Sequence, residues 1–191
     1  DSNYYPTRNN IQQEINELVS WGNQNKHSEI WLSYSGHGYY VKDWNNDEKD
    51  GKDELICTVD EHFIRDDWFK TNLINKLNDD VKLFILMDCC HSGTICDIQH
   101  ENPENMKKNI VMISGCRDNQ TSADAAFTVR EEYEWRGALT HTFMNTYDSN
   151  HNINEHCETI QKSIQSRFTQ IPTLSYTGSE KSFMNICLKE I

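Results

Sequence analysis

A nearly continuous apolar run, Val81–Met87 (VKLFILM), limits the fold of this chain more than any other segment. A strand with this pattern is typically buried on both faces, as in a parallel sheet covered by helices. The run stops at Asp88–Gly93 (DCCHSG), and a second run, Glu29–Tyr34 (EIWLSY), stops at Ser35–Gly38 (SGHG). Because glycine and other small residues favour tight turns, both strands are expected to end in loops that carry reactive side chains.

Candidate strands alternate with candidate helices along the 191 residues, which predicts an α/β fold in one domain, residues 1–191. Apolar periodicity predicts helices from Thr7 to about Trp21 and from about Asp66, Gly137 and Asn154. The predicted strands are Glu29–Tyr34, Leu55–Val59, Val81–Met87, Ile110–Ile113 and Ser182–Leu188. In open parallel sheets, sites lie beyond the carboxyl ends of the strands, which is where His37 and Cys90 stand.

Composition excludes several classes of partner. The chain has 18 Lys plus Arg against 30 Asp plus Glu, a formal charge of −12, which argues against binding to nucleic acid or to an anionic membrane surface. Its longest strongly apolar run, Leu83–Met87, is far shorter than the roughly 20 residues of a spanning helix. Seven cysteines, two of them adjacent, do not resemble a disulfide framework, so we expect a reducing, cytoplasmic location.

Cys90 and His37 form a candidate nucleophile and base. A thiol nucleophile needs a partner that lowers its pKa and protonates the leaving amine, and an imidazole does both. The backbone amide of Gly38, together with that of Cys90, would face a developing oxyanion. Either residue alone is more often structural, but the two together, each in a turn of small residues, favour catalysis.

The motif Ser35–Gly38 followed by Asp88–Gly93 resembles the catalytic pair of the metacaspases, in the caspase-like cysteine peptidase clan. The resemblance continues in Ser114–Asp124 and Gln170–Ser175 and covers roughly residues 5 to 188. It implies a caspase-like sandwich, with a mostly parallel central sheet and helices on both faces. Residues 1–97 then match the large-subunit part, and residues 109–191 match the small-subunit part.

The same resemblance implies a type I metacaspase that cleaves protein or peptide substrates after Arg or Lys and acts as a monomer. Cys90 is then the nucleophile and His37 the general acid and base. The alternative is a caspase-like module that binds calcium or partners without cleaving. A caspase with acidic specificity is disfavoured, because the carboxylate of Asp88 would repel an acidic P1 residue.

Asp88 and Ser35 are the candidate substrate-binding residues. Asp88 lies two residues before Cys90 and so projects to the same side of the strand. A carboxylate there can bind a guanidinium through two hydrogen bonds, and Ser35, two residues before His37, adds a hydroxyl. The resemblance assigns both to the S1 pocket. The other interpretation of Asp88 is a helix cap or a solvated turn.

Calcium is the expected cofactor. The acidic loop at residues 43–53 fails as an EF-hand, because with Gly51 at loop position six, position twelve is Cys57 instead of Glu. The resemblance instead implies that an activating Ca²⁺ is bound by four aspartates, Asp53, Asp66, Asp67 and Asp97. The other interpretation makes Asp66 a helix N-cap and Asp67 a residue of the first helical turn.

Two further expectations concern the ends and the middle of the chain. Metacaspases normally begin their domain with a hydrophobic strand and a helix, and this sequence starts after both, so we expect an incomplete N-terminal part with an open sheet edge. Self-cleavage is common in the wider group. The basic pair Lys107–Lys108, in a polar stretch, is the expected site of autoprocessing.

Overall fold

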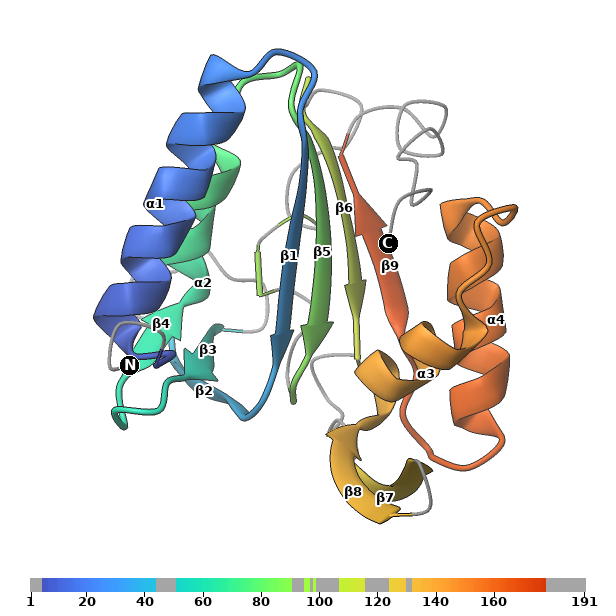
Figure 1. Ribbon diagram of the computed structural model, residues 1–191. Coiled ribbons are helices and arrows are strands. Elements are labelled where there is room, and N and C mark those ends of the chain that lie inside the picture. The colour runs from blue at the N-terminus through green and yellow to red at the C-terminus, as the bar shows by residue number, and fades with distance from the viewer. Residues whose placement is uncertain are drawn as a thin grey trace.

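Figure 1 shows the computed structural model of the chain. The structure describes residues 5–43, 51–90, 95–96, 98, 107–115, 124–129 and 132–177, and for residues 124–129 and 132–136 the backbone alone. The expected strand Ser182–Leu188 and the candidate ligand Asp97 lie outside these residues. In the parts that are described, every helix is too short or too polar to cross a bilayer.

The central sheet has four strands in the order β1 (Glu29–Ser35), β5 (Lys82–Asp88), β6 (Asn109–Ser114) and β9 (Thr173–Tyr176). The pairs β1–β5 and β5–β6 are parallel, and β9 joins β6 in the antiparallel direction. The sequence therefore predicted a mostly parallel sheet correctly. It did not predict β9, whose four residues (TLSY) are too few and too polar to stand out.

Helices cover both faces of the sheet, as the apolar run required (Figure 1). One face carries α1 (Arg8–Gln24) and α2 (Asp66–Phe69), which continues as the π-helical turn η2 (Lys70–Ile74). The other face carries α3 (Ala138–Thr146) and α4 (Ile153–Gln165).

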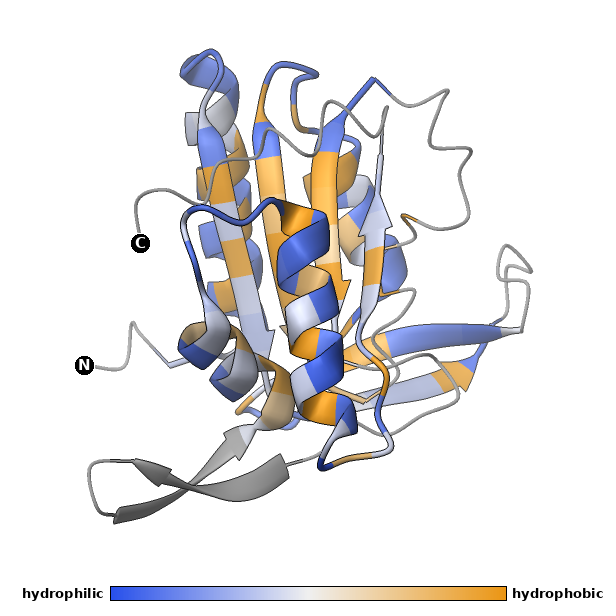
Figure 2. Ribbon diagram, turned by 90° about the vertical axis from the view of Figure 1, so that its right-hand side faces the viewer, coloured by the Kyte–Doolittle hydropathy of each residue, from blue (hydrophilic) through white to orange (hydrophobic). Residues whose placement is uncertain are grey.

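Along β5 the side chains alternate between two core clusters. Leu83, Ile85 and Met87 pack toward α1 and η2, whereas Phe84 and Leu86 pack toward α3 and α4. Figure 2 shows that the central strands are mostly apolar, whereas the helices packed against them carry both apolar and polar residues. The run is apolar at nearly every position because each face of the strand meets a helical layer.

Local signals set the starts of the longer helices. The Thr7 hydroxyl accepts a hydrogen bond from the backbone amide of Asn10, so Thr7 caps α1 as predicted. Asn152 and Glu155 form a reciprocal capping box at the start of α4. Both helices thus begin where a short polar side chain satisfies amides that have no acceptor within the helix.

Two smaller sheets lie near the carboxyl ends of β1 and β5 (Figure 1). The first is antiparallel and contains β2 (Gly38–Lys42), β3 (Lys52–Cys57) and β4 (Phe63–Arg65). The second is the hairpin of β7 (Asp124–Val129) and β8 (Glu132–Gly137), which leads directly into α3. These two small sheets therefore lie next to the ends of β1 and β5, where His37 and Cys90 were expected.

Candidate active site

The two reactive loops begin side by side. In the parallel pairing of β1 and β5, Ser35 lies opposite Asp88. The backbone amide of Gly36 donates a hydrogen bond to the carbonyl of Asp88 at 3.1 Å. The turn that carries His37 therefore leaves β1 beside the residue that stands two positions before Cys90.

Gly38 brings the loops into direct contact. A Cβ atom built on Gly38 would lie 2.1 Å from the carbonyl oxygen of Cys90 and 3.2 Å from Cβ of Cys89. Only a residue without a side chain permits this approach. His37 is exposed and Cys90 is half-buried, so substrate can reach both residues.

Cys89 and Cys90 have different environments. Cys89 is 1% exposed and belongs to the core cluster that contains Met87, two residues earlier. Cys90 is half-buried at the start of the loop. This is the alternation expected of neighbouring residues at a strand end, and it makes Cys90 the accessible thiol of the pair.

Tyr34 anchors the turn that carries His37. Its hydroxyl lies 2.9 Å from the carbonyl oxygen of His37 and 2.8 Å from that of Cys57, and the amide of Cys57 donates to the same His37 carbonyl at 3.0 Å. Burial raises the pKa of Tyr34, so its phenol remains a protonated donor. Sequence reasoning missed this residue, because nothing near it in the sequence marks its contact with Cys57.

Asp88 and Ser35 meet at Gly137, the first residue before α3. Asp88 is only 2% exposed, and its Oδ2 accepts a hydrogen bond of 2.7 Å from the amide of Thr140. Asp88 thus accepts from an amide in the first turn of α3, although the N-cap residue of that helix is Gly137. A Cβ built on Gly137 would lie 2.2 Å from Oδ2 of Asp88 and 2.9 Å from Oγ of Ser35, so both groups pack closely against Gly137.

Three of the four predicted metal-ligating aspartates gather at the junction of β3 and α2. One carboxylate oxygen each from Asp53, Asp66 and Asp67 lies within 4.8 Å of the others. Asp66 accepts hydrogen bonds of 2.7 Å from the amides of Glu54 and Asp67. Asp66 is the first residue of α2 and not its N-cap, which corrects the alternative interpretation of that residue.

The charges of this cluster are poorly balanced. Burial raises the pKa of Asp53, and the negative charges of Asp67 and Asp43 raise it further, while the paired guanidinium of Arg65 lowers it. Asp43 is buried, and the sequence did not single it out. A set of hard carboxylate oxygens with excess negative charge fits a hard divalent cation such as Ca²⁺.

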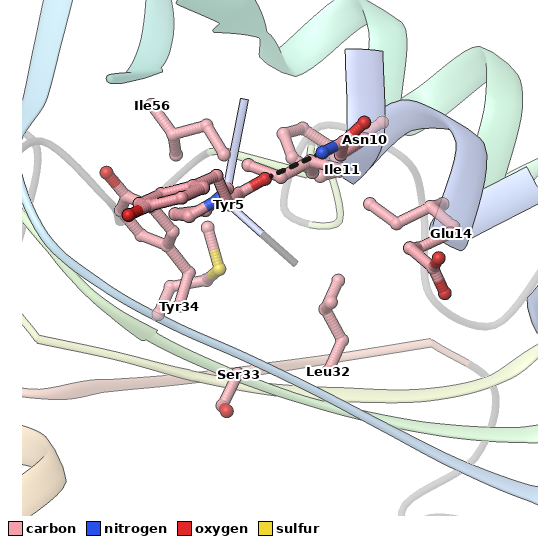
Figure 3. Close-up of a pocket in the computed structure, with 12 residues that line it drawn as sticks. Tyr5, Asn10, Ile11, Glu14, Leu32, Ser33, Tyr34 and Ile56 are labelled. Carbon is pink, nitrogen blue, oxygen red and sulfur yellow. Dashed lines mark hydrogen bonds between the residues drawn. The ribbon is translucent and has the colours of Figure 1, made fainter. Parts of the chain in front are cut away.

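A separate apolar cavity lies beneath α1 (Figure 3). It has a volume of about 400 Å³ and is lined by Ile11 of α1 and Leu32 and Tyr34 of β1, among others. His37 and Cys90 are not among its lining residues. This cavity is therefore distinct from the candidate nucleophile and base, and Tyr34, which lines it, also contacts the turn that carries His37.

Comparison with known proteins gives a consistent family. A family model for the metacaspase peptidase C14 domain matches residues 1–99. Metacaspase-2 of Arabidopsis thaliana is 30% identical over 172 residues, which cover 78% of this chain and 40% of that protein. Metacaspase-1 of Plasmodium falciparum isolate 3D7 is 35% identical over 136 residues, which cover 63% of this chain and 22% of that protein.

A solved structure supports the same fold. The crystal structure of a structural-genomics target from Geobacter sulfurreducens matches with a TM-score of 0.69 and 25% identity, covering 94% of this chain and 77% of that chain. The chain spans less than half the length of the two metacaspases compared above. The matched residues 1–99 are more than half of this chain and include both His37 and Cys90, and the chain therefore belongs to the metacaspase family, with a caspase-like α/β fold.

Proposed function

We propose that this chain is a cysteine endopeptidase in which Cys90 and His37 form the catalytic dyad. The observation that carries the proposal is the contact between the two loops, with Ser35 opposite Asp88 and Gly38 packed on the carbonyl of Cys90. Family membership supports the same chemistry. The proposal covers protein or peptide substrates with a basic P1 residue.

The reaction follows from the groups at this edge of the sheet. The thiolate of Cys90 attacks the scissile carbonyl carbon, and a C–S bond forms. The oxyanion would face the backbone amides of Gly38 and Cys90. His37, which has taken the thiol proton of Cys90, gives it to the leaving amine as the C–N bond breaks. Water then attacks the acyl-enzyme, the C–S bond breaks, and the carboxylic acid and free Cys90 are released.

The basic P1 preference rests on Asp88. A carboxylate beside a serine hydroxyl can accept two hydrogen bonds from a guanidinium, whereas an acidic P1 side chain would be repelled. The backbone amide of Thr140, in the first turn of α3, donates a hydrogen bond to this buried carboxylate. Asp88 is therefore suited to hold an arginine or lysine side chain.

The first experiment compares fluorogenic peptides that end in Arg, Lys or Asp, with Ca²⁺ or with chelator. Cleavage after Arg and Lys is expected, and Cys90→Ala should lose it completely. Cys157→Ala removes a thiol of α4 and should leave the rate within a factor of about two. Cleavage that survives in Cys90→Ala, or that occurs only after Asp, would reject the proposal. Silence from the intact wild-type protein would favour the non-catalytic module.

We also propose that Ca²⁺ binds at Asp53, Asp66 and Asp67 and activates the enzyme. The charge imbalance at this cluster, in which Asp53 and Asp66 are buried and Asp67 is half-buried, supports the assignment, and a bound divalent cation would supply the missing positive charge. Asp97, the fourth predicted ligand, lies outside the described residues. Arg65 must release Asp53 when the cation binds, and its side chain is 48% exposed, so it has room to move.

Two variants test the calcium site, because they are expected to change its affinity for Ca²⁺ in opposite directions. Asp67→Asn should weaken Ca²⁺ binding about tenfold or more, measured by calorimetry and by the Ca²⁺-dependent rise in melting temperature. Arg65→Met removes the competing cation and should tighten binding. Asp79→Asn, an exposed carboxylate that pairs with Lys108, is the matched control. Unchanged binding in Asp67→Asn would reject the assignment.

A further inference from the structure

The helix α3 begins without a cap from its own sequence. Its N-cap residue, Gly137, has no side chain, and the helix therefore lacks a side-chain cap hydrogen bond at that position. The first amides of a helix have no acceptor within the helix and need one from elsewhere. Here the acceptor is Asp88, at the end of β5, whose Oδ2 lies 2.7 Å from the amide of Thr140, 52 residues away.

Position 137 requires glycine because a side chain there would clash with its neighbours, and not because of its backbone dihedral angles. Its φ of −62° and ψ of 134° are open to any residue. A Cβ atom, however, would lie 2.2 Å from Oδ2 and 2.5 Å from Cγ of Asp88, and 2.9 Å from Oγ of Ser35. Any side chain at this position must therefore displace the carboxylate, the hydroxyl or the start of α3.

We propose that Gly137 and Thr140 are positioning residues for P1 recognition. Together they hold the carboxylate of Asp88 beside Ser35 in one orientation. This inference rests on the proposed function and adds a contribution from the small-subunit part of the chain. Gly137 allows the close approach, and the Thr140 amide fixes the rotation of the carboxylate. Neither residue needs to touch the substrate.

Orientation matters because of the geometry of the ligand. A guanidinium binds a carboxylate best through two parallel hydrogen bonds, and that arrangement tolerates little rotation of either group. A displaced carboxylate would keep its charge but lose the paired contact. Binding of P1 arginine should therefore suffer more than the reactivity of Cys90.

The test uses matched peptides with arginine or citrulline at P1, since citrulline has nearly the same shape without the charge. In Gly137→Ala, the preference for arginine over citrulline should fall about tenfold, mainly through a higher KM for the arginine peptide. Alkylation of Cys90 by iodoacetamide, which does not use the P1 pocket, should stay within about twofold of wild type.

The matched control is Gly22→Ala in α1. A Cβ at Gly22 would also be crowded, 2.7 Å from Cδ1 of Ile30, but it lies away from the reactive loops. This variant should keep the arginine preference of the wild type even if its melting temperature falls. If Gly22→Ala also loses the preference for arginine, the effect of Gly137→Ala is explained by general destabilisation, and the inference is overturned.

The Thr140→Pro variant tests the positioning role independently of Gly137. Proline removes the amide that donates to Asp88, and it is tolerated in the first turn of a helix. The arginine preference should fall here too, whereas Thr140→Ser, which keeps the amide, should retain it. If Gly137→Ala does not fold, this pair of variants decides the question.

The outcomes separate this inference from the proposed function. A wild-type enzyme that cleaves arginine and citrulline peptides equally well would contradict the basic specificity itself. A wild-type enzyme that prefers arginine, together with folded Gly137→Ala or Thr140→Pro that keeps the full preference, would overturn only the positioning role.

Discussion

At the scale of single residues, the candidate site depends on close approaches that few side chains allow. Gly38 rests on the carbonyl of Cys90, and Gly137 rests on the carboxylate of Asp88. Tyr34 makes the third such contact, because its ring and hydroxyl fill the space inside the turn next to Gly36. The conformation of the two reactive loops therefore depends on the packing of these neighbouring residues as well as on the reactive residues themselves.

Tyr34→Phe tests this support. The change keeps the ring and removes the hydroxyl that contacts the carbonyls of His37 and Cys57, so we expect a loss of about 1 kcal/mol in the free energy of unfolding. The catalytic rate should fall several-fold, because the turn that carries His37 loses an anchor. Urea unfolding and peptide hydrolysis measure the two effects.

The control for that variant is Tyr39→Phe, at an exposed tyrosine of β2 whose ring stacks on Tyr40. It should change neither stability nor rate. If Tyr34→Phe matches wild type in both measurements, the hydroxyl does not support the turn.

At the scale of elements, the junction of α3 and α4 contains an unusual buried histidine. His156 is 1% exposed, and neither nitrogen of its ring has a partner in good hydrogen-bond geometry, although the backbone of Asp148 is close enough to favour its protonated form. Its ring stacks on Tyr147 at 5.3 Å, and the ring of His151 meets it edge-on at 5.6 Å. The ring packs as an aromatic residue would, and the burial of its nitrogens costs free energy.

This environment predicts a loss of stability in acid. Burial lowers the pKa of His156, and the nearby charge of His151 lowers it further, while Asp148 and Glu155 act in the opposite direction. The folded state therefore resists protonation more than the unfolded chain, whose histidine titrates near 6.5. Stability is lost as the pH falls from that value until the lower folded pKa is passed.

His156→Phe should remove this part of the pH dependence. Phenylalanine keeps the aromatic packing and buries no unpaired nitrogen, so the variant should be about 1 kcal/mol more stable than wild type at pH 7.5. The advantage should grow at pH 5.5, as measured by urea unfolding at both values. His27→Asn, at an exposed histidine, should leave the pH dependence unchanged. An equal acid-induced loss in His156→Phe and wild type would contradict the prediction.

At the scale of the whole molecule, the segment between β5 and β6 joins two parts that share one sheet. Lys107 and Lys108, just before β6, differ in environment. Lys107 is exposed, whereas the ammonium of Lys108 contacts the carbonyl of Leu77 and lies 3.5 Å from a carboxylate oxygen of Asp79. Of the two basic residues predicted for self-cleavage, Lys107 is the one available as P1.

Autoprocessing is therefore expected after Lys107. Lys107→Gln should abolish the cut in this segment, and Lys108→Gln should not, as judged by mass spectrometry of the active protein. The two fragments should remain associated on size-exclusion chromatography, because β6 pairs with β5 at six positions and is buried in both core clusters. Cleavage that persists in Lys107→Gln, or fragments that separate, would contradict this picture.

The sequence was sufficient for several features that depend on local pattern. The apolar run of β5 indicated a sheet covered on both faces, Thr7 marked the start of α1, and the turns after two strands marked His37 and Cys90. Each of these signals lies within a few residues, because periodicity and capping are properties of a short segment.

Contacts between distant segments were beyond the reach of such patterns. The link between Tyr34 and Cys57, the place of Asp43 among the buried aspartates, and the seating of Gly137 on Asp88 each join residues that no spacing rule relates. These contacts depend on the register of β1 on β5 and on where α3 docks. Long-range packing determines both the register and the docking. The motif identifies an aspartate in the sequence, but only the tertiary structure shows which residues surround it.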